Sequence, residues 1–333
     1  MTQIEICQQV AECLNKNGPH VLKGHAEETC ALVADILDQK SACQIDTEAR
    51  EEGEEVQDIS EYESVLISTA TDVVGAMANV YGADFIEPLK QLLPKITKYY
   101  VRSCFCGVRS MSNYSFSSSL QAPSRSAADR ATAIGSLGEI MTGMKSAITP
   151  FTTDILSLLS RGLQDEEIGI RSNAAFASGV LVEHSQEDLS QHYQALLGAI
   201  RPLFDLPRAE SKDENLQASD NACGCLGRLI IKNQAAVPLE QALPVLMDAL
   251  PLKKDAAEWS SVLVALMGLI QGNNGQALHY IDTILVIMRH ALQADGEDAI
   301  GSLLRGQVVA FVSAIHATAP EKVVAAGLQP FLV

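Results

Sequence analysis

A polar pair followed by a run of small and aliphatic residues occurs twice in this chain, and this repeat restricts the possible folds more than any other feature. Ser172-Asn173 precedes the run 174–181, and Asp220-Asn221 precedes the run 222–227. A weaker copy starts at Asp129-Arg130. Such self-similarity is typical of repeat proteins, in which each unit buries its apolar face against its neighbours.

The copies are separated by 43 residues from Arg130 to Asn173 and by 48 residues from Asn173 to Asn221. Two-helix repeats of the HEAT and armadillo type have periods of about 40–47 residues, and a longer loop accommodates the second spacing. The sequence therefore predicts an all-α fold. We expect a right-handed α-solenoid of antiparallel helix pairs (HEAT repeats), with residues 1–333 forming a single domain.

Each copy is predicted to be the inner, or B, helix of its pair. Ala174, Ala177 and Val180 recur at helical spacing, so they form one buried stripe. Small residues let neighbouring helices approach closely. The polar residues that begin each B helix then repeat in register along the stack, and such a column usually lines the binding face of a solenoid.

Apolar periodicity and turn signals predict the remaining helices. The predicted helices span residues 3–15, 19–39, 62–81, 85–100, 128–144, 149–163, 166–184, 189–204, 215–232, 238–250, 256–271, 277–292, 298–318 and a short final segment from Pro320.

Two segments interrupt this pattern. Residues 46–63 hold nine acidic residues and one basic residue, which predicts a solvated loop or a frayed helix start. This acidic loop either attracts a basic ligand or only keeps the protein soluble. Residues 103–125 are Ser-rich and aperiodic, which predicts a disordered or poorly ordered insertion.

The composition favours a binding protein with basic partners. Aromatic residues make up only 5% of the chain, and 41 Asp and Glu residues outnumber 24 Lys and Arg residues, for a formal charge of −17. An acidic excess of this size repels nucleic acid and anionic membranes. No apolar run reaches the ~20 residues that a membrane-spanning helix needs.

The eight cysteines lie mostly within apolar helical pattern, and we interpret them as reduced thiols of a cytosolic or nuclear chain. The pairs Cys104-x-Cys106 and Cys223-x-Cys225 lack the further ligands of a zinc site, so no metal or cofactor is expected. No phosphate-binding loop, zinc-protease motif or nucleophile elbow is present. The sequence therefore predicts no enzyme activity.

The B-helix face is instead predicted to bind an extended basic peptide. Asn side chains hydrogen-bond a peptide backbone, carboxylates pair with Lys or Arg, and an indole accepts a cation. In the alternative interpretation, Asn173 and Asn221 make hydrogen bonds between repeats and Trp259 fills the core. The residues predicted to line the binding face are Asn173, Asp220, Asn221, Asp255 and Glu258, with Trp259 beside them.

Three separated motifs resemble the C-terminal HEAT repeats of the beta-karyopherins, most of all the importin-four subfamily that imports histones and ribosomal proteins. These motifs are residues 172–185, 220–222 and 250–255. The resemblance implies a shuttling, monomeric nuclear import receptor without a cofactor, whose C-terminal half grips a basic segment such as a histone H3 tail or H3–H4. It also implies that this chain is a C-terminal fragment and that Ran-GTP binds to missing N-terminal repeats.

Within this family, Asn221, Glu258 and Ser261 match the positions expected to form a lysine pocket. Ala256-Ala257 departs from the bulky residue and second acid of relatives, which weakens the charge there. Another possibility is a HEAT-repeat scaffold for complex assembly, of the phosphatase-subunit or tubulin-binding type. The acidic loops argue against a tubulin binder, because tubulin is itself acidic.

Overall fold

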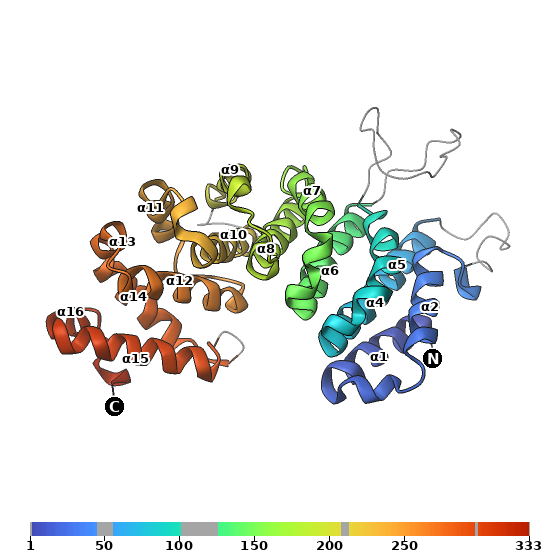
Figure 1. Cartoon of the computed structure of the whole chain (residues 1–333), viewed down its shortest axis with the longest axis horizontal. Coiled ribbons are helices and arrows are strands. Elements are labelled where there is room, and N and C mark those ends of the chain that lie inside the picture. Colours follow the sequence, from blue (N-terminus) through green and yellow to red (C-terminus); the bar gives the residue numbers. More distant parts are fainter. Residues whose placement is uncertain (1, 45–55, 101–125, 208–212, 297–298, 333) are drawn as a thin grey trace. The chain divides into compact units, whose positions relative to one another are not determined.

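The computed structural model describes residues 2–44, 56–100, 126–207, 213–296 and 299–332 (Figure 1). These residues form α-helices joined by turns and short 3-10 helices, and they contain no strand. They belong to two compact units, unit 1 (Met1–Ala147) and unit 2 (Ile148–Val333). The predicted all-α fold of packed helix pairs is confirmed.

In unit 1 the long helix α4 is central. It packs against α1 on one side and α6 on the other, and together these three helices form the inner layer. The outer helices α2 and α5 pack beside each other, with α2 lying on α4. The bounds are α1 (Gln3–Asn17), α2 (Ala26–Leu37), α4 (Val56–Tyr81), α5 (Ile86–Thr97) and α6 (Ala127–Met144).

In unit 2 the inner layer begins with α8, α10 and α12, which pack in this order, and α10 lies between the other two. The outer helix α7 packs on α8, and α9 and α11 pack on α10. The bounds are α7 (Thr152–Gly162), α8 (Ile168–His184), α9 (Tyr193–Phe204), α10 (Asp213–Asn233), α11 (Leu239–Ala249), α12 (Trp259–Gln271), α13 (Gly275–His279), α14 (Ile281–Gln293), α15 (Ser302–Thr318) and α16 (Pro320–Ala325).

Helix α10 is enclosed by its neighbours, since every residue from Ala218 to Gly227 is buried. Small residues make this possible. A Cβ atom added to Gly227 would lie 2.7 Å from the backbone oxygen of Ser261 on α12. A Cβ on Gly179 of α8 would lie 2.9 Å from the Cα of Cys225. At these glycines the neighbouring inner helices are therefore too close to admit a larger side chain.

The structure corrects three of the predicted helices and qualifies the acidic segment. The predicted helix 277–292 is divided at Tyr280 into α13 and α14. The predicted helix 19–39 is interrupted, because Gly24 has a left-handed φ of 83° and α2 begins only at Ala26. The last long helix starts at Ser302 rather than at 298. Of the acidic segment, residues 46–55 lie outside the described residues, and those from Val56 are helical. The Ser-rich insertion and Cys104 and Cys106 also lie outside the described residues.

Substituting Gly227 by Ala should destabilise unit 2. The new methyl group meets backbone that cannot rotate away, so α12 must shift, and we expect a loss of about 1–3 kcal/mol in the free energy of unfolding. Gly268→Ala on α12 is the control, because nothing lies within 4 Å of a Cβ atom added there and the helix gains up to about 1 kcal/mol. Equal unfolding midpoints in denaturant for both variants would contradict this close approach.

An ion-pair cluster on unit 1 should make its stability depend on acid pH. Asp38 at the end of α2 pairs with Lys98 at 3.0 Å and with Lys95, both from the α5 side. Burial alone raises the pKa of Asp38, but the two lysines outweigh burial and hold the pKa well below its usual range.

A depressed carboxyl pKa stabilises the fold above the unfolded-state pKa of about 4, and this stability is lost as the pH falls further. Thermal unfolding should therefore show that Asp38→Asn lowers stability by about 1 kcal/mol at pH 7 and by less at pH 3. The exposed Asp35→Asn is the control. A difference that does not change with pH would count against the cluster.

Candidate functional site

Asp220 ties the loop before α12 to helix α10. Its side chain is buried, and one carboxylate oxygen accepts hydrogen bonds from the backbone N–H groups of Lys253, Lys254 and Asp255 at 2.7, 2.6 and 3.0 Å. Burial raises the pKa of Asp220, and these N–H groups oppose that increase because they stabilise the carboxylate. Asp220 therefore fixes the position of the 250–255 motif.

Asn221 joins α10 to α8 and leaves one acceptor unused. Its Nδ2 donates to the Oγ of Ser172 at 3.0 Å and to the carbonyl oxygen of Ser172 at 3.3 Å. Its Oδ1 is buried and has no hydrogen-bond partner in the part of the chain that the structure describes. A buried polar atom without a partner is costly, so this unused acceptor is an exception among the polar atoms of α10 that needs an explanation.

Glu258 is completely buried at the start of α12, in the 3-10 turn η6 (Ala256–Glu258). Arg228 donates to both of its carboxylate oxygens, at 2.5 and 3.1 Å, and the Oγ of Ser261 donates at 3.2 Å. Burial raises the pKa of Glu258, and Arg228 opposes this change. Residue 224 must be small, since a Cβ added to Gly224 would lie 1.2 Å from Oε2 of Glu258.

Arg228 connects three inner helices through this cluster. From α10 it reaches Glu258, and its Nε donates to Glu183 of α8 at 2.9 Å. Its guanidinium lies over the ring of Phe176, 5.5 Å from the ring centroid. Burial by itself lowers the pKa of Arg228, but the adjacent Glu258 and Glu183 raise it overall, so the side chain stays charged.

The other predicted residues lie around this cluster with different exposure. Asn173 is half-buried, and Asp255 is half-buried with its Oδ1 accepting the Ala257 N–H at 3.2 Å. Trp259 is only 5% exposed. The geometry agrees with the alternative interpretation for two residues, because Asn221 bonds to a neighbouring repeat and Trp259 is buried in the core. A role of the predicted residues in binding a peptide stays a prediction.

Sequence reasoning missed Arg228 and Glu183, which complete the cluster. Glu183 is the more accessible of the two carboxylates, with 47% of its side chain exposed. One signal was present, namely a single arginine inside the apolar run of α10, seven residues after Asn221. A cation at that place in a buried helix requires an anionic partner, although the sequence does not identify it.

Charges of both signs lie on the loop before α12 and at the start of α10. Lys253 and Lys254 of the loop are exposed, and Lys254 pairs with Asp213 at 2.8 Å. The face is therefore less acidic than the net charge of the chain suggests.

The Cys223-x-Cys225 pair consists of packed thiols. Both side chains are fully buried, and burial raises the pKa of Cys225 to about 12. Within the described ranges no cluster of three potential metal ligands occurs. None of the described helices has the length and apolar character needed to cross a membrane.

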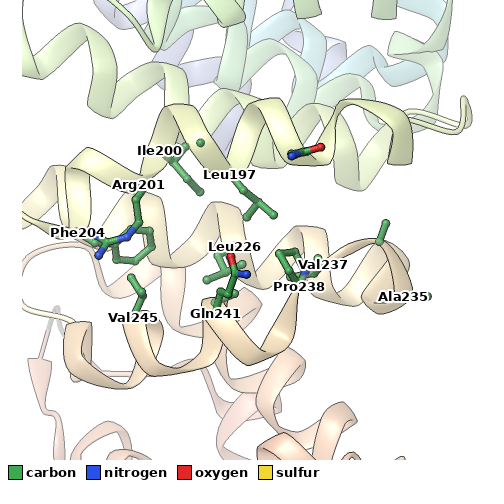
Figure 2. Close-up of a pocket in the computed structure, with 14 residues that line it drawn as sticks. Leu197, Ile200, Arg201, Phe204, Leu226, Ala235, Val237, Pro238, Gln241 and Val245 are labelled. Atoms are coloured by element: carbon green, nitrogen blue, oxygen red, sulfur yellow. The ribbon is translucent and has the colours of Figure 1, made fainter.

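On the outer side of unit 2, α9 and α11 leave a groove over α10 with a volume of about 750 Å³. Leu197, Ile200 and Phe204 of α9 face Gln241 and Val245 of α11 across it (Figure 2). This outer groove of unit 2 is lined mainly by apolar side chains, with two glutamines, one cation (Arg201) and no carboxylate among the described residues.

Comparison with known proteins identifies relatives of one kind. The chain is 32% identical over 294 residues to the probable importin subunit beta-4 of Schizosaccharomyces pombe, a match that covers 86% of this chain and 25% of that protein. It is 29% identical over 265 residues to human importin-4, covering 79% of this chain and 22% of the relative, and 27% identical to mouse importin-4 over the same shares.

The chain thus spans about a quarter of the length of these relatives. No family model matches the sequence. Among solved structures, an engineered protein aligns with 98% of this chain and 82% of its own at 12% identity, with a TM-score of only 0.32. The sequence matches to the importin subunits show that the chain belongs to the importin-4-like beta-karyopherin family.

Proposed function

We propose that this chain is part of a nuclear import receptor and that it binds basic segments of protein cargo. The observation that carries this proposal is the 32% identity to an importin beta subunit over 294 residues. The expected cargo is a lysine-rich segment such as a histone H3 tail or H3–H4, or else a ribosomal protein. The formal charge of −17 suits such partners.

The proposed contact point is the unused oxygen of Asn221. A lysine ammonium group carries three donors and no acceptor, so it can supply the hydrogen bond that Oδ1 lacks. Gly224 lies one helical turn further along α10, where the carboxylate of Glu258 covers it. A lysine at Asn221 therefore approaches the paired Glu258 and Arg228, and the second partner of Arg228, Glu183, leaves this cluster with one net negative charge.

The remaining predicted residues divide by accessibility. Asn173 and Asp255 are half-buried and can touch a peptide at the edges of the site. Asn221 is itself buried, and we propose that it meets the lysine at the floor of the site. The other buried residues, which we propose support the site from behind, are Asp220, Glu258, Trp259 and Ser261. Glu183, the exposed partner of Arg228, adds an accessible carboxylate.

At the level of the whole receptor, we propose a monomer that shuttles between cytoplasm and nucleus and is not an enzyme. Ran-GTP would bind to N-terminal repeats of such a receptor rather than to this segment. A structural scaffold is the alternative, and it predicts binding of a folded partner without dependence on lysine.

Asn221→Leu should weaken binding of a histone H3 tail peptide about tenfold, because a hydrogen bond to a charged group contributes ~1.5–3 kcal/mol and 1.4 kcal/mol is a factor of ten. Titration at two salt concentrations measures the affinity, which should fall with salt and with acetylation of the lysines.

Ser172→Ala is the matched control. It removes the side-chain acceptor for Nδ2 of Asn221 but leaves Oδ1 in place, so peptide affinity should not change. If both variants lose only stability and bind the peptide equally well, Asn221 serves the repeat contact alone. No binding of either the acetylated or the unmodified peptide would contradict the cargo function and favour a scaffold.

A further inference from the structure

Unit 1 contains a second groove, equivalent in position to the outer groove of unit 2. It lies between the outer helices α2 and α5 above the C-terminal part of α4, and its volume is about 610 Å³. We call it the acidic outer groove. Its lining residues are Ala26, Glu27, Cys30, Ala31, Ala34, Met77, Tyr81, Asp84, Phe85, Glu87, Pro88, Gln91 and Leu92.

The floor of this groove is apolar. Met77, Phe85 and Leu92 are buried, and the thiol of Cys30 lies 4.0 Å from the sulfur of Met77. On α2 the lining positions are mostly alanines, and small side chains let another chain approach the helix closely. The floor can therefore hold an apolar side chain or the aliphatic stem of a longer one.

The rim carries negative charge. Glu27 lies in the first turn of α2, Asp84 lies in the 3-10 turn η2 (Gly82–Phe85), and Glu87 lies in the first turn of α5. Glu87 pairs with the exposed Lys90 at 2.5 Å, whereas no Lys or Arg is among the residues that line the groove. The ring of Tyr81 adds an aromatic wall suited to a cation.

The two grooves of this chain share their architecture and differ in charge. Both lie between consecutive outer helices over an inner helix. The only charged residue among the described ones that line the outer groove of unit 2 is Arg201. The shape of both grooves thus results from the stacking of the helices. The three carboxylates, by contrast, occur only in the groove of unit 1. A cationic and partly apolar ligand complements only the acidic outer groove.

We propose that the acidic outer groove is a binding site for a short basic segment of a partner protein, with an apolar anchor on the floor and a flanking lysine or arginine at Glu27 and Asp84. This site is separate from the one at Asn221 and does not depend on its function. It gives the chain a second contact for basic proteins, on a different layer of helices.

Cys30 provides a local test. Its thiol is half-buried in the groove. Burial and the negative charge of Glu27 raise the pKa of this thiol, so alkylation is followed at alkaline pH, where more of it is the reactive thiolate. The probe is a short peptide of alternating lysine and leucine. It should slow alkylation of Cys30 at least about fivefold, as read by mass spectrometry, but leave the exposed Cys13 unaffected.

Neutralising the rim with Glu27→Gln and Asp84→Asn should weaken the peptide about tenfold by removing both complementary charges. The matched control, Glu28→Gln with Asp35→Asn, removes the same net charge from exposed residues that do not line the groove. It should bind almost as the unchanged chain does. Asn221→Leu should not alter Cys30 protection, which separates this site from the proposed cargo site.

Three results would overturn the proposal. Cys30 could react at the same rate with saturating peptide. A peptide with glutamate in place of lysine could protect it equally. The control double variant could also weaken peptide binding as much as the double variant of Glu27 and Asp84. The weaker binding would then be explained by the net charge of the chain rather than by the groove.

Discussion

The inner layer of unit 2 depends on one buried charge. Glu258 has no contact with solvent, and a carboxylate in such a place is unfavourable unless it is paired and hydrogen-bonded. Arg228 supplies two hydrogen bonds to it and a third to Glu183 of the preceding repeat. The pairing fixes the relative position of α8, α10 and the start of α12, because each helix contributes one member.

Other features of the layer follow from this pairing. Gly224 leaves the space that the Glu258 carboxylate occupies, and Gly179 and Gly227 bring the helices close enough for polar side chains to bridge them. Asp220 and Asn221 extend the bridging to the loop before α12 and to α8. Of these bridging side chains, Asn221 has an oxygen left without a partner among the described atoms. The same side chain that joins two repeats thus provides the proposed cargo contact.

The helices were largely predictable from the sequence, because burial on one side imposes a helical period on apolar residues. The break at Gly24 was not predictable, because the apolar periodicity continues through it and only the left-handed backbone of Gly24 interrupts the helix. The sequence predicted that the polar residues of the site repeat in register along the inner helices, but it did not predict the separate role of each residue. Asp220 and Asn221 are adjacent in sequence, yet Asp220 accepts hydrogen bonds from the loop before α12, whereas Asn221 donates hydrogen bonds to Ser172 of the preceding inner helix α8. Arg228 was missed because its partners are 45 and 30 residues away.

A double-mutant cycle of Arg228→Met and Glu258→Gln tests most directly whether this buried pair organises the inner layer. Arg228→Met leaves Glu258 uncompensated and should cost about 3–5 kcal/mol of unfolding free energy. The double variant should be clearly more stable than the sum of the single losses predicts, with a coupling energy of about 2 kcal/mol or more. Additive losses, or an Arg228→Met variant as stable as the unchanged chain, would contradict the account.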